Sequence, residues 1–177
     1  MIFTEREVKG VYVIELELFD DERGFFAQSF SQREFEARGL VSQFVESNVS
    51  YNRRRGTLRG LHYQAAPYGQ AKLVRCTRGA IFDVAVDVRP SSPTFRQWVG
   101  AQLTEENRLM MYLPADLAHG FQALEDNTEV FYQVSEVYAP ATYKGYRWND
   151  PAFAVKWPLP DELVLNKRDE SYPYFKL

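Results

Sequence analysis

The stretch Phe82-Asp83-Val84-Ala85-Val86-Asp87-Val88 decides the fold class of this sequence. Phe and Val occupy every second position, and the positions between them hold Asp and Ala. Successive side chains of a β-strand point to opposite faces of a sheet, so this alternation predicts a half-buried strand. Residues 129–134 alternate in the same way, with Val130, Tyr132 and Val134 on one face. The dominant pattern is therefore that of β-structure.

Further short runs rich in β-branched and aromatic residues lie on both sides of this stretch, separated by turn sequences such as Arg89-Pro90-Ser91-Ser92-Pro93. Helical features are few: Ser31 and Glu34 have capping-box spacing, which predicts a short helix over 32–38, and a helical turn is expected within 160–170. We therefore predict an all-β fold, a jelly-roll barrel or β-sandwich with a few short helices, formed by residues 1–177 as a single domain. The expected strands are 11–18, 24–30, 44–50, 57–63, 72–77, 82–88, 97–103, 108–113, 120–124 and 129–134.

Composition excludes several classes of protein. The 177 residues include 2 His and 1 Cys, which excludes an intrachain disulfide and a zinc site made only of His and Cys. A net charge of −3 does not fit a nucleic-acid-binding protein. No apolar run approaches the ~18 residues of a membrane span, and the charged start of the chain does not resemble a signal peptide. We expect a soluble, cytoplasmic protein that binds neither nucleic acid nor membranes.

The two histidines lie in different settings. His62 lies in a predicted strand with Gly60, where a bend would bring Arg59 and His62 into one pocket. A strand histidine is more often structural than catalytic, so both interpretations are open. His119 follows Pro114 in a stretch typical of a loop that enters a strand. His119 is therefore either a functional loop residue or a hydrogen-bonded turn histidine.

Three other side chains have both an ordinary and a chemical interpretation. Lys72 begins an apolar strand, where it is either a solvated edge residue or an inward cation for an oxyanion. Tyr132 is either a core aromatic or a proton donor. Asp169 is a surface charge unless the tail folds back, in which case it could fix the tautomer of His62.

Metal and cofactor binding are not expected. Metal sites in barrels of the cupin kind use a His-x-His pair, whereas His62 is followed by Tyr63 and Gln64. This disfavours a metal-dependent oxygenase. Phosphate-binding glycine motifs are absent too. Anion binding would rest on Arg23, Arg59, Lys72 or Arg168.

The most specific feature of the sequence is L-R-G-L-H-Y-Q over 58–64, with Lys72 ten residues after its histidine. Further characteristic stretches are 21–26, 56–64, 70–75, 79–87, 91–95, 118–121 and 147–151. Together they resemble the dTDP-4-dehydrorhamnose 3,5-epimerase family, metal-independent, cupin-like enzymes of sugar-nucleotide metabolism. The resemblance covers nearly the whole chain.

The resemblance implies a jelly roll that forms homodimers, with sheets shared across the interface, and a dTDP-4-keto-6-deoxysugar substrate. It implies that His62 is the catalytic base, Asp169 the carboxylate that orients it, Tyr132 the proton donor and Lys72 the cation that stabilises an enolate. No cofactor is implied. The residues that match substrate contacts of the family are Arg23, Phe26, Asn48, Arg59, His119 and Tyr138.

Four positions among the substrate-binding residues depart from the family pattern. Gln28, Glu46 and Tyr143 stand where the family has Glu, Gln and Glu, and Arg168 replaces a Lys. The first three bear on which nucleotide and sugar are preferred. The function expected is epimerisation of dTDP-4-dehydro-6-deoxy-D-glucose at C3 and C5 to dTDP-4-dehydro-L-rhamnose, in dTDP-L-rhamnose biosynthesis. The alternatives are a single-carbon epimerase of another NDP-4-keto-6-deoxysugar and a non-catalytic sugar-nucleotide-binding cupin.

Overall fold

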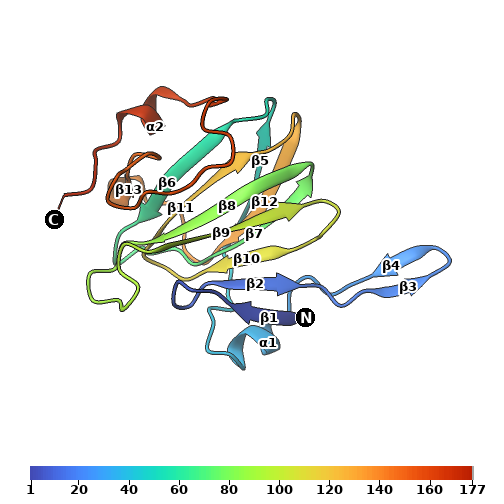
Figure 1. Ribbon diagram of the computed structural model, residues 1–177. Coiled ribbons are helices and arrows are strands. Elements are labelled where there is room, and N and C mark those ends of the chain that lie inside the picture. Colours follow the sequence, from blue (N-terminus) through green and yellow to red (C-terminus); the bar gives the residue numbers. More distant parts are fainter. Residues whose placement is uncertain (177) are drawn as a thin grey trace.

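In the computed structural model, residues 1–176 are described and form two antiparallel β-sheets that face each other (Figure 1). Side chains from both sheets build the core between them. The six-stranded sheet has the order β1 (Ile2–Glu5), β2 (Tyr12–Glu15), β10 (Met110–Leu113), β7 (Lys72–Arg78), β12 (Thr128–Val134) and β5 (Glu46–Asn52). The five-stranded sheet has the order β13 (Tyr143–Gly145), β6 (Leu58–Gln64), β11 (Leu117–Ala123), β8 (Ala80–Asp87) and β9 (Trp98–Thr104).

This architecture confirms the predicted all-β jelly roll. Each expected strand is present, although those predicted over 11–18, 24–30 and 108–113 are shorter. Helix α1 (Gln32–Glu36) begins after Ser31, whose side chain accepts a hydrogen bond from the Glu34 amide as the capping box predicts. Helix α2 (Lys167–Ser171) overlaps the end of the window expected for the second helical turn. The elements that were not predicted are β1, β3 (Phe19–Asp21), β13 and the 3₁₀ turn η1 (Pro140–Thr142).

The strand that decided the fold class is buried on both faces, so the prediction of a half-buried strand is wrong. Asp83 and Asp87 of β8 are fully buried on the face between the sheets, next to core residues such as Ala85. Val84 and Val86 face the other way and are covered by the C-terminal arm, residues 146–176. The arm supplies a second apolar layer that the strand's own pattern does not reveal.

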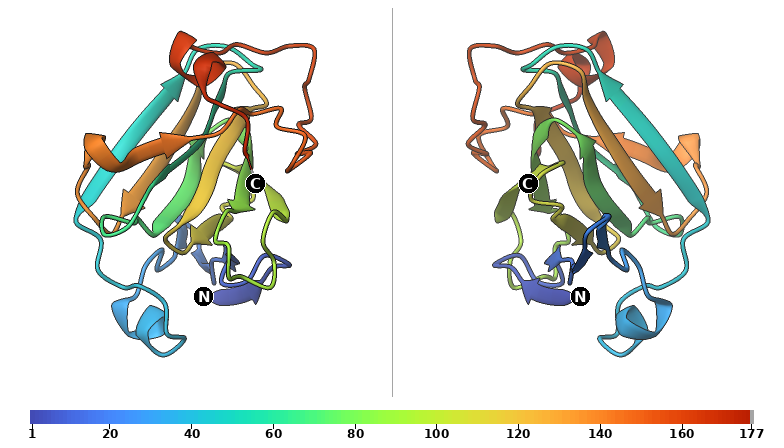
Figure 2. Two further views of the ribbon diagram at one scale, coloured as in Figure 1. Left: turned by 90° about the vertical axis from the view of Figure 1, so that its left-hand side faces the viewer. Right: turned by 90° about the vertical axis from the view of Figure 1, so that its right-hand side faces the viewer.

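Aromatic packing orders the C-terminal arm. The ring of Phe175 lies 5.4 Å from that of Phe153 and 5.5 Å from that of Tyr146, measured between centroids. The indole of Trp157 donates a hydrogen bond to the Trp148 carbonyl at 2.8 Å. The arm is therefore an ordered layer on the five-stranded sheet. Figure 2 shows that α2, which belongs to this arm, lies at the opposite end of the sandwich from α1.

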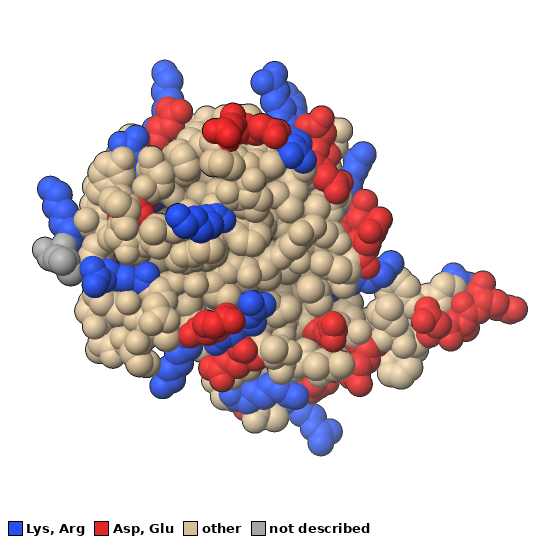
Figure 3. All heavy atoms as spheres, in the orientation of Figure 1, with Lys and Arg blue, Asp and Glu red and all other residues tan. Residues whose placement is uncertain are grey.

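A hairpin formed by β3 and β4 (Gly24–Phe26) projects from the body of the molecule (Figure 1). All of its strand residues are exposed, including Phe19 at 66% and Phe26 at 71%. Figure 3 shows acidic side chains gathered at its tip, where Asp20, Asp21 and Glu22 lie. The hairpin therefore leaves large apolar side chains open to solvent in the single chain.

The buried carboxylate of Asp87 stabilises the fold through the loop that follows β8. It accepts hydrogen bonds from Arg89 Nε at 2.9 Å, from Thr94 Oγ1 at 2.6 Å and from the Ser92 hydroxyl. Burial alone raises the pKa of Asp87, but these hydrogen bonds outweigh it and lower the pKa to about 2.

We expect Asp87→Asn to lower the free energy of unfolding by about 2 kcal/mol at pH 7. In the unsubstituted protein this stabilisation is present above pH about 4 and is lost as the pH falls towards about 2, because the folded-state pKa of Asp87 is depressed. Urea unfolding at pH 7 measures the effect. Asp161→Asn, at an exposed position, is the control, and equal stability of the two variants would contradict the role of Asp87.

Candidate active site

A cavity of about 150 Å³ lies between the two sheets, with α2 contributing residues to its wall. All four side chains predicted to be catalytic line it, although they come from β6, β7, β12 and α2. Four of the predicted substrate contacts line it as well. The lining residues are Ser50, Arg59, His62, Lys72, His119, Phe121, Tyr132, Tyr143, Asn166, Arg168 and Asp169.

The partly buried His62 and the fully buried Asp169 form a pair in this cavity. The Nε2 atom of His62 lies 2.8 Å from Oδ1 of Asp169, and Oδ2 of Asp169 accepts a hydrogen bond from the Gly60 amide at 3.3 Å. Asp169 is fully buried because the arm folds back, so its interpretation as a surface charge is wrong. The side chain of Asn166 caps α2 by accepting from the Asp169 amide at 2.8 Å, which fixes where the carboxylate lies.

This geometry defines which imidazole nitrogen is free. A carboxylate at Nε2 favours the tautomer with the proton on Nε2, so Nδ1 carries the lone pair. Burial lowers the pKa of His62, against the opposing effect of Asp169. Burial raises the pKa of Asp169, but the hydrogen bond with His62 and its charge outweigh it and leave that pKa below its usual value. His62 is therefore neutral at pH 7 and able to accept a proton.

A bend in β6 brings Arg59 and His62 to the same cavity, as the position of Gly60 predicts. Gly60 has a φ of +136°, which favours glycine, and the register between β6 and β11 shifts at this point. A Cβ at Gly60 would lie 2.5 Å from the Cα of Gly120, so the close approach is between two strands rather than to a ligand.

Lys72 and Tyr132 supply a cation and a hydroxyl from the six-stranded sheet. Lys72 is 8% exposed, so its interpretation as a solvated edge residue is wrong. Burial lowers the pKa of Lys72 to about 8, while the nearby Asp83 carboxylate opposes this shift. Burial raises the pKa of the half-buried Tyr132, so its hydroxyl keeps its proton at neutral pH.

His119 and Asp83 form a second His–Asp pair, which is buried. Of the two residues, only His119 was predicted to belong to the site. The Nε2 atom of His119 lies 2.8 Å from Oδ1 of Asp83, and Oδ2 of Asp83 is buried without a hydrogen-bond partner among the described residues. His119 lies within β11 rather than in a loop, which corrects the sequence interpretation. Sequence reasoning missed Asp83. The sequence did contain one indication that Asp83 is buried. It is an acidic residue among the apolar residues 80–86, and such a residue is buried if neither face of the strand is open to solvent.

A groove of about 280 Å³ shares Lys72, Tyr132, Tyr143 and Arg168 with the cavity. The guanidinium of Arg168 lies 5.3 Å from the ring centroid of Tyr143. Three more predicted substrate contacts meet in this groove, namely Glu46, Asn48 and Tyr138.

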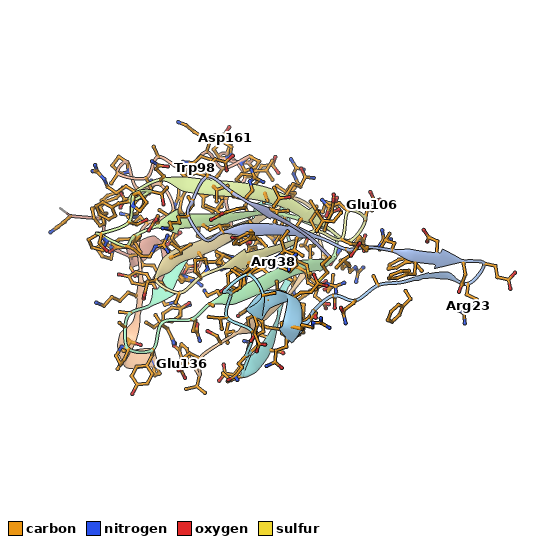
Figure 4. The ribbon with its side chains drawn as sticks, turned by 90° about the horizontal axis from the view of Figure 1, so that it is seen from below. Arg23, Arg38, Trp98, Glu106, Glu136 and Asp161 are labelled. Carbon is orange, nitrogen blue, oxygen red and sulfur yellow. The ribbon has the colours of Figure 1, made fainter. Side chains whose placement is uncertain are left out.

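The remaining predicted contacts are not brought to the cavity or the groove. Arg23 and Phe26 belong to the projecting hairpin, and Gln28 follows it. Figure 4 shows Arg23 at the far end of that hairpin, away from the two sheets. Within the single chain, these three residues contribute to neither the cavity nor the groove.

Comparison with known proteins decides the family. The sequence model of the family described as dTDP-4-dehydrorhamnose 3,5-epimerase matches residues 5–176. The chain belongs to the dTDP-4-dehydrorhamnose 3,5-epimerase family. A family member from Pseudomonas aeruginosa is 46% identical over 169 residues, which cover 95% of this chain and 92% of the relative.

Solved structures of this family are similar to this chain in sequence and in fold. The dTDP-4-dehydrorhamnose 3,5-epimerase of Elizabethkingia anophelis is 36% identical, covers 99% of this chain and 96% of its own, and has a TM-score of 0.96. The dTDP-6-deoxy-D-glucose-3,5-epimerase of Legionella pneumophila, in complex with dTDP-4-keto-L-rhamnose, is 37% identical with a TM-score of 0.91 and covers 98% and 92% of the two chains.

Two further observations concern the described part of this epimerase-family chain. Across residues 1–176, no three His, Cys, Asp or Glu side chains are grouped so that they could hold a metal ion. Over the same residues, each helix is too short or too polar to cross a membrane.

Proposed function

We propose that the chain is a dTDP-4-dehydrorhamnose 3,5-epimerase, which converts dTDP-4-dehydro-6-deoxy-D-glucose to dTDP-4-dehydro-L-rhamnose in dTDP-L-rhamnose biosynthesis. The observation that carries this proposal is the His62–Asp169 pair in a cavity that Lys72 and Tyr132 also line. A base, a cation and an acid in one pocket suit proton abstraction next to a carbonyl. The bound dTDP-4-keto-L-rhamnose of the Legionella neighbour supports the same substrate class.

The proposed mechanism needs only side chains of this chain. The protons on C3 and C5 of a 4-keto sugar are both α to the carbonyl, so removing either one gives an enolate. We assign proton removal to Nδ1 of His62 and stabilisation of the enolate oxygen to the ammonium of Lys72. Inversion requires a proton from the opposite face, which we assign to the hydroxyl of Tyr132. Return of the electron pair from the enolate oxygen to carbon then restores the ketone. We assign no metal and no cofactor to these steps.

We infer that the enzyme is a cytoplasmic homodimer of single-domain subunits, in which each hairpin packs on the second copy. The exposure of Phe19 and Phe26 supports this assembly. It would bring Arg23, Phe26 and Gln28 to the partner's groove, where Arg23 could meet the diphosphate and Phe26 the base. Sedimentation equilibrium is expected to give the mass of two chains, and a monomer at micromolar concentration would contradict the arrangement.

The stereochemistry of the product tests the proposed function. The protein is incubated with dTDP-4-dehydro-6-deoxy-D-glucose, and proton–proton couplings around the sugar ring are followed by NMR. We expect inversion at both C3 and C5. Inversion at one carbon would instead identify a single-carbon epimerase. Tight binding of the substrate without inversion would identify a non-catalytic binding protein.

We expect Tyr132→Phe to impair epimerisation more than proton removal. The substitution removes only the hydroxyl, so His62 and Lys72 can still form the enolate, but the proton donor on the opposite face is lost. In D₂O the variant should exchange substrate protons while inversion falls by about 10²-fold. The two rates are measured in one NMR time course, and equal losses in both would contradict the donor role.

A further inference from the structure

Two tyrosine rings pack against His62 without a role in the proton transfers proposed above. The ring centroids of Tyr143 and Tyr172 each lie 5.4 Å from that of the imidazole, at interplanar angles of 46° and 59°. Tyr143 is the first residue of β13, and Tyr172 directly follows α2. We call these two rings the aromatic wall.

A glycine in the backbone of β13 leaves space for the aromatic wall. Gly145 of β13 lies opposite His62 in the pairing of β13 with β6. A Cβ at Gly145 would lie 2.7 Å from Cζ of Tyr172, so a larger residue there would displace the ring. The arm is held beyond the wall as well, since the Phe175 amide donates a hydrogen bond to the buried carboxylate of Asp150.

Charged and titratable groups surround the imidazole on its other sides. The Asp169 carboxylate favours the imidazolium form, whereas the cations Lys72 and Arg168 disfavour it. Burial is the largest of these influences, and it lowers the pKa of His62. These charged and titratable groups come from several parts of the fold: Asp169 and Arg168 on α2, Arg59 on β6, Lys72 on β7, His119 on β11, Tyr132 on β12 and Tyr143 on β13, with Tyr172 directly after α2.

We propose that Tyr143 and Tyr172 are positioning residues that shield His62 from water on its β13 side, so that the imidazole stays neutral beside the Asp169 carboxylate. The physical reason is that the Asp169 carboxylate has two opposing effects on His62. A buried carboxylate orients the base but also stabilises its protonated form, and a protonated histidine cannot take a proton from the sugar. Excluding water from the imidazole offsets that effect, because burial disfavours the charged form. This inference rests on the proposed function in taking His62 as the base.

The test is an NMR titration of the His62 imidazole in the unsubstituted protein and in Tyr172→Ala. Opening the wall to water should raise the pKa of His62 by about 0.5 to 1 unit. The acid limb of the kcat/KM profile should move in the same direction. Tyr172→Phe keeps the ring and should titrate as the unsubstituted protein does. Tyr174→Ala is the matched control, because this neighbouring tyrosine packs on Arg147 rather than on His62.

A pKa of His62 that is unchanged or lower in Tyr172→Ala would overturn the inference, as would an equal shift in Tyr172→Phe. If Tyr172→Ala does not fold, Tyr143→Leu removes the other ring of the wall and is judged by the same criterion. The titration needs no substrate, so its outcome is separate from that of the proposed function. A raised pKa in a protein that turns over no 4-keto sugar would support the wall and reject the activity.

Discussion

Replacing His62 by Asn will reduce turnover of dTDP-4-dehydro-6-deoxy-D-glucose by about 10³-fold or more. Asn can still hydrogen-bond to Asp169, but it has no nitrogen lone pair that can accept a proton at neutral pH. The only other histidine of the chain, His119, is bonded to Asp83 and belongs to a different pair. Initial rates of substrate loss, measured by NMR, give the effect.

Binding of dTDP separates this chemical effect from a loss of the site. Calorimetry should give the same affinity for dTDP in His62→Asn as in the unsubstituted protein, within about twofold, because the nucleotide is expected in the groove with Glu46, Asn48 and Tyr138. Turnover above a tenth of the original rate, with binding retained, would show that another group is the base.

Replacing Lys72 by Met is expected to reduce kcat by about 10² to 10³-fold, with a smaller change in KM. Met has a similar length but carries no charge, so the enolate oxygen loses its cation in a site where Lys72 is 8% exposed. A buried cation stabilises a developing oxyanion far more than an exposed one, because water screens it less. Lys144→Met, at an exposed position of β13, is the matched control.

The pH profile provides a second readout for Lys72. Its pKa is lowered to about 8, so the protonated form that the mechanism needs predominates at pH 7 and declines above pH 8. The unsubstituted enzyme should therefore lose activity as the pH rises through about 8, whereas the residual activity of Lys72→Met should not. A basic limb that persists unchanged in Lys72→Met would assign that ionisation to another group.

Strands such as β9 and β12 were predictable from the sequence because one of their faces is buried and the other is more exposed. In β12, Val130 and Val134 are buried as the alternation predicts, and Tyr132 shares their face. The same reasoning failed for β8, because residues about 70 positions later cover its second face. Local periodicity contains no information about a layer that the chain adds from a distant segment.

The chemistry of single side chains was less predictable than the strands. Residue type alone left both a surface and a chemical interpretation open for Lys72 and for Asp169, and the family resemblance supplied their roles. Asp169 meets His62 across 107 positions of sequence, so only the folded arm could reveal the pair. Asp83 was missed for a related reason, since its burial depends on both sheets being in place. Arg23 and Phe26 lie on a hairpin outside the site, a separation that no motif spacing indicates.

The proposed mechanism requires that His62, in this cavity, removes the protons on both carbons next to the 4-keto group. The most direct measurement is the entry of solvent deuterium at C3 and C5 of dTDP-4-dehydro-6-deoxy-D-glucose, followed by NMR in D₂O with the unsubstituted protein and with His62→Asn. The proposed mechanism predicts deuterium at both carbons with the unsubstituted protein and at neither with His62→Asn. Exchange that continues at either carbon in His62→Asn, or that is absent at both carbons with the unsubstituted protein, would contradict it.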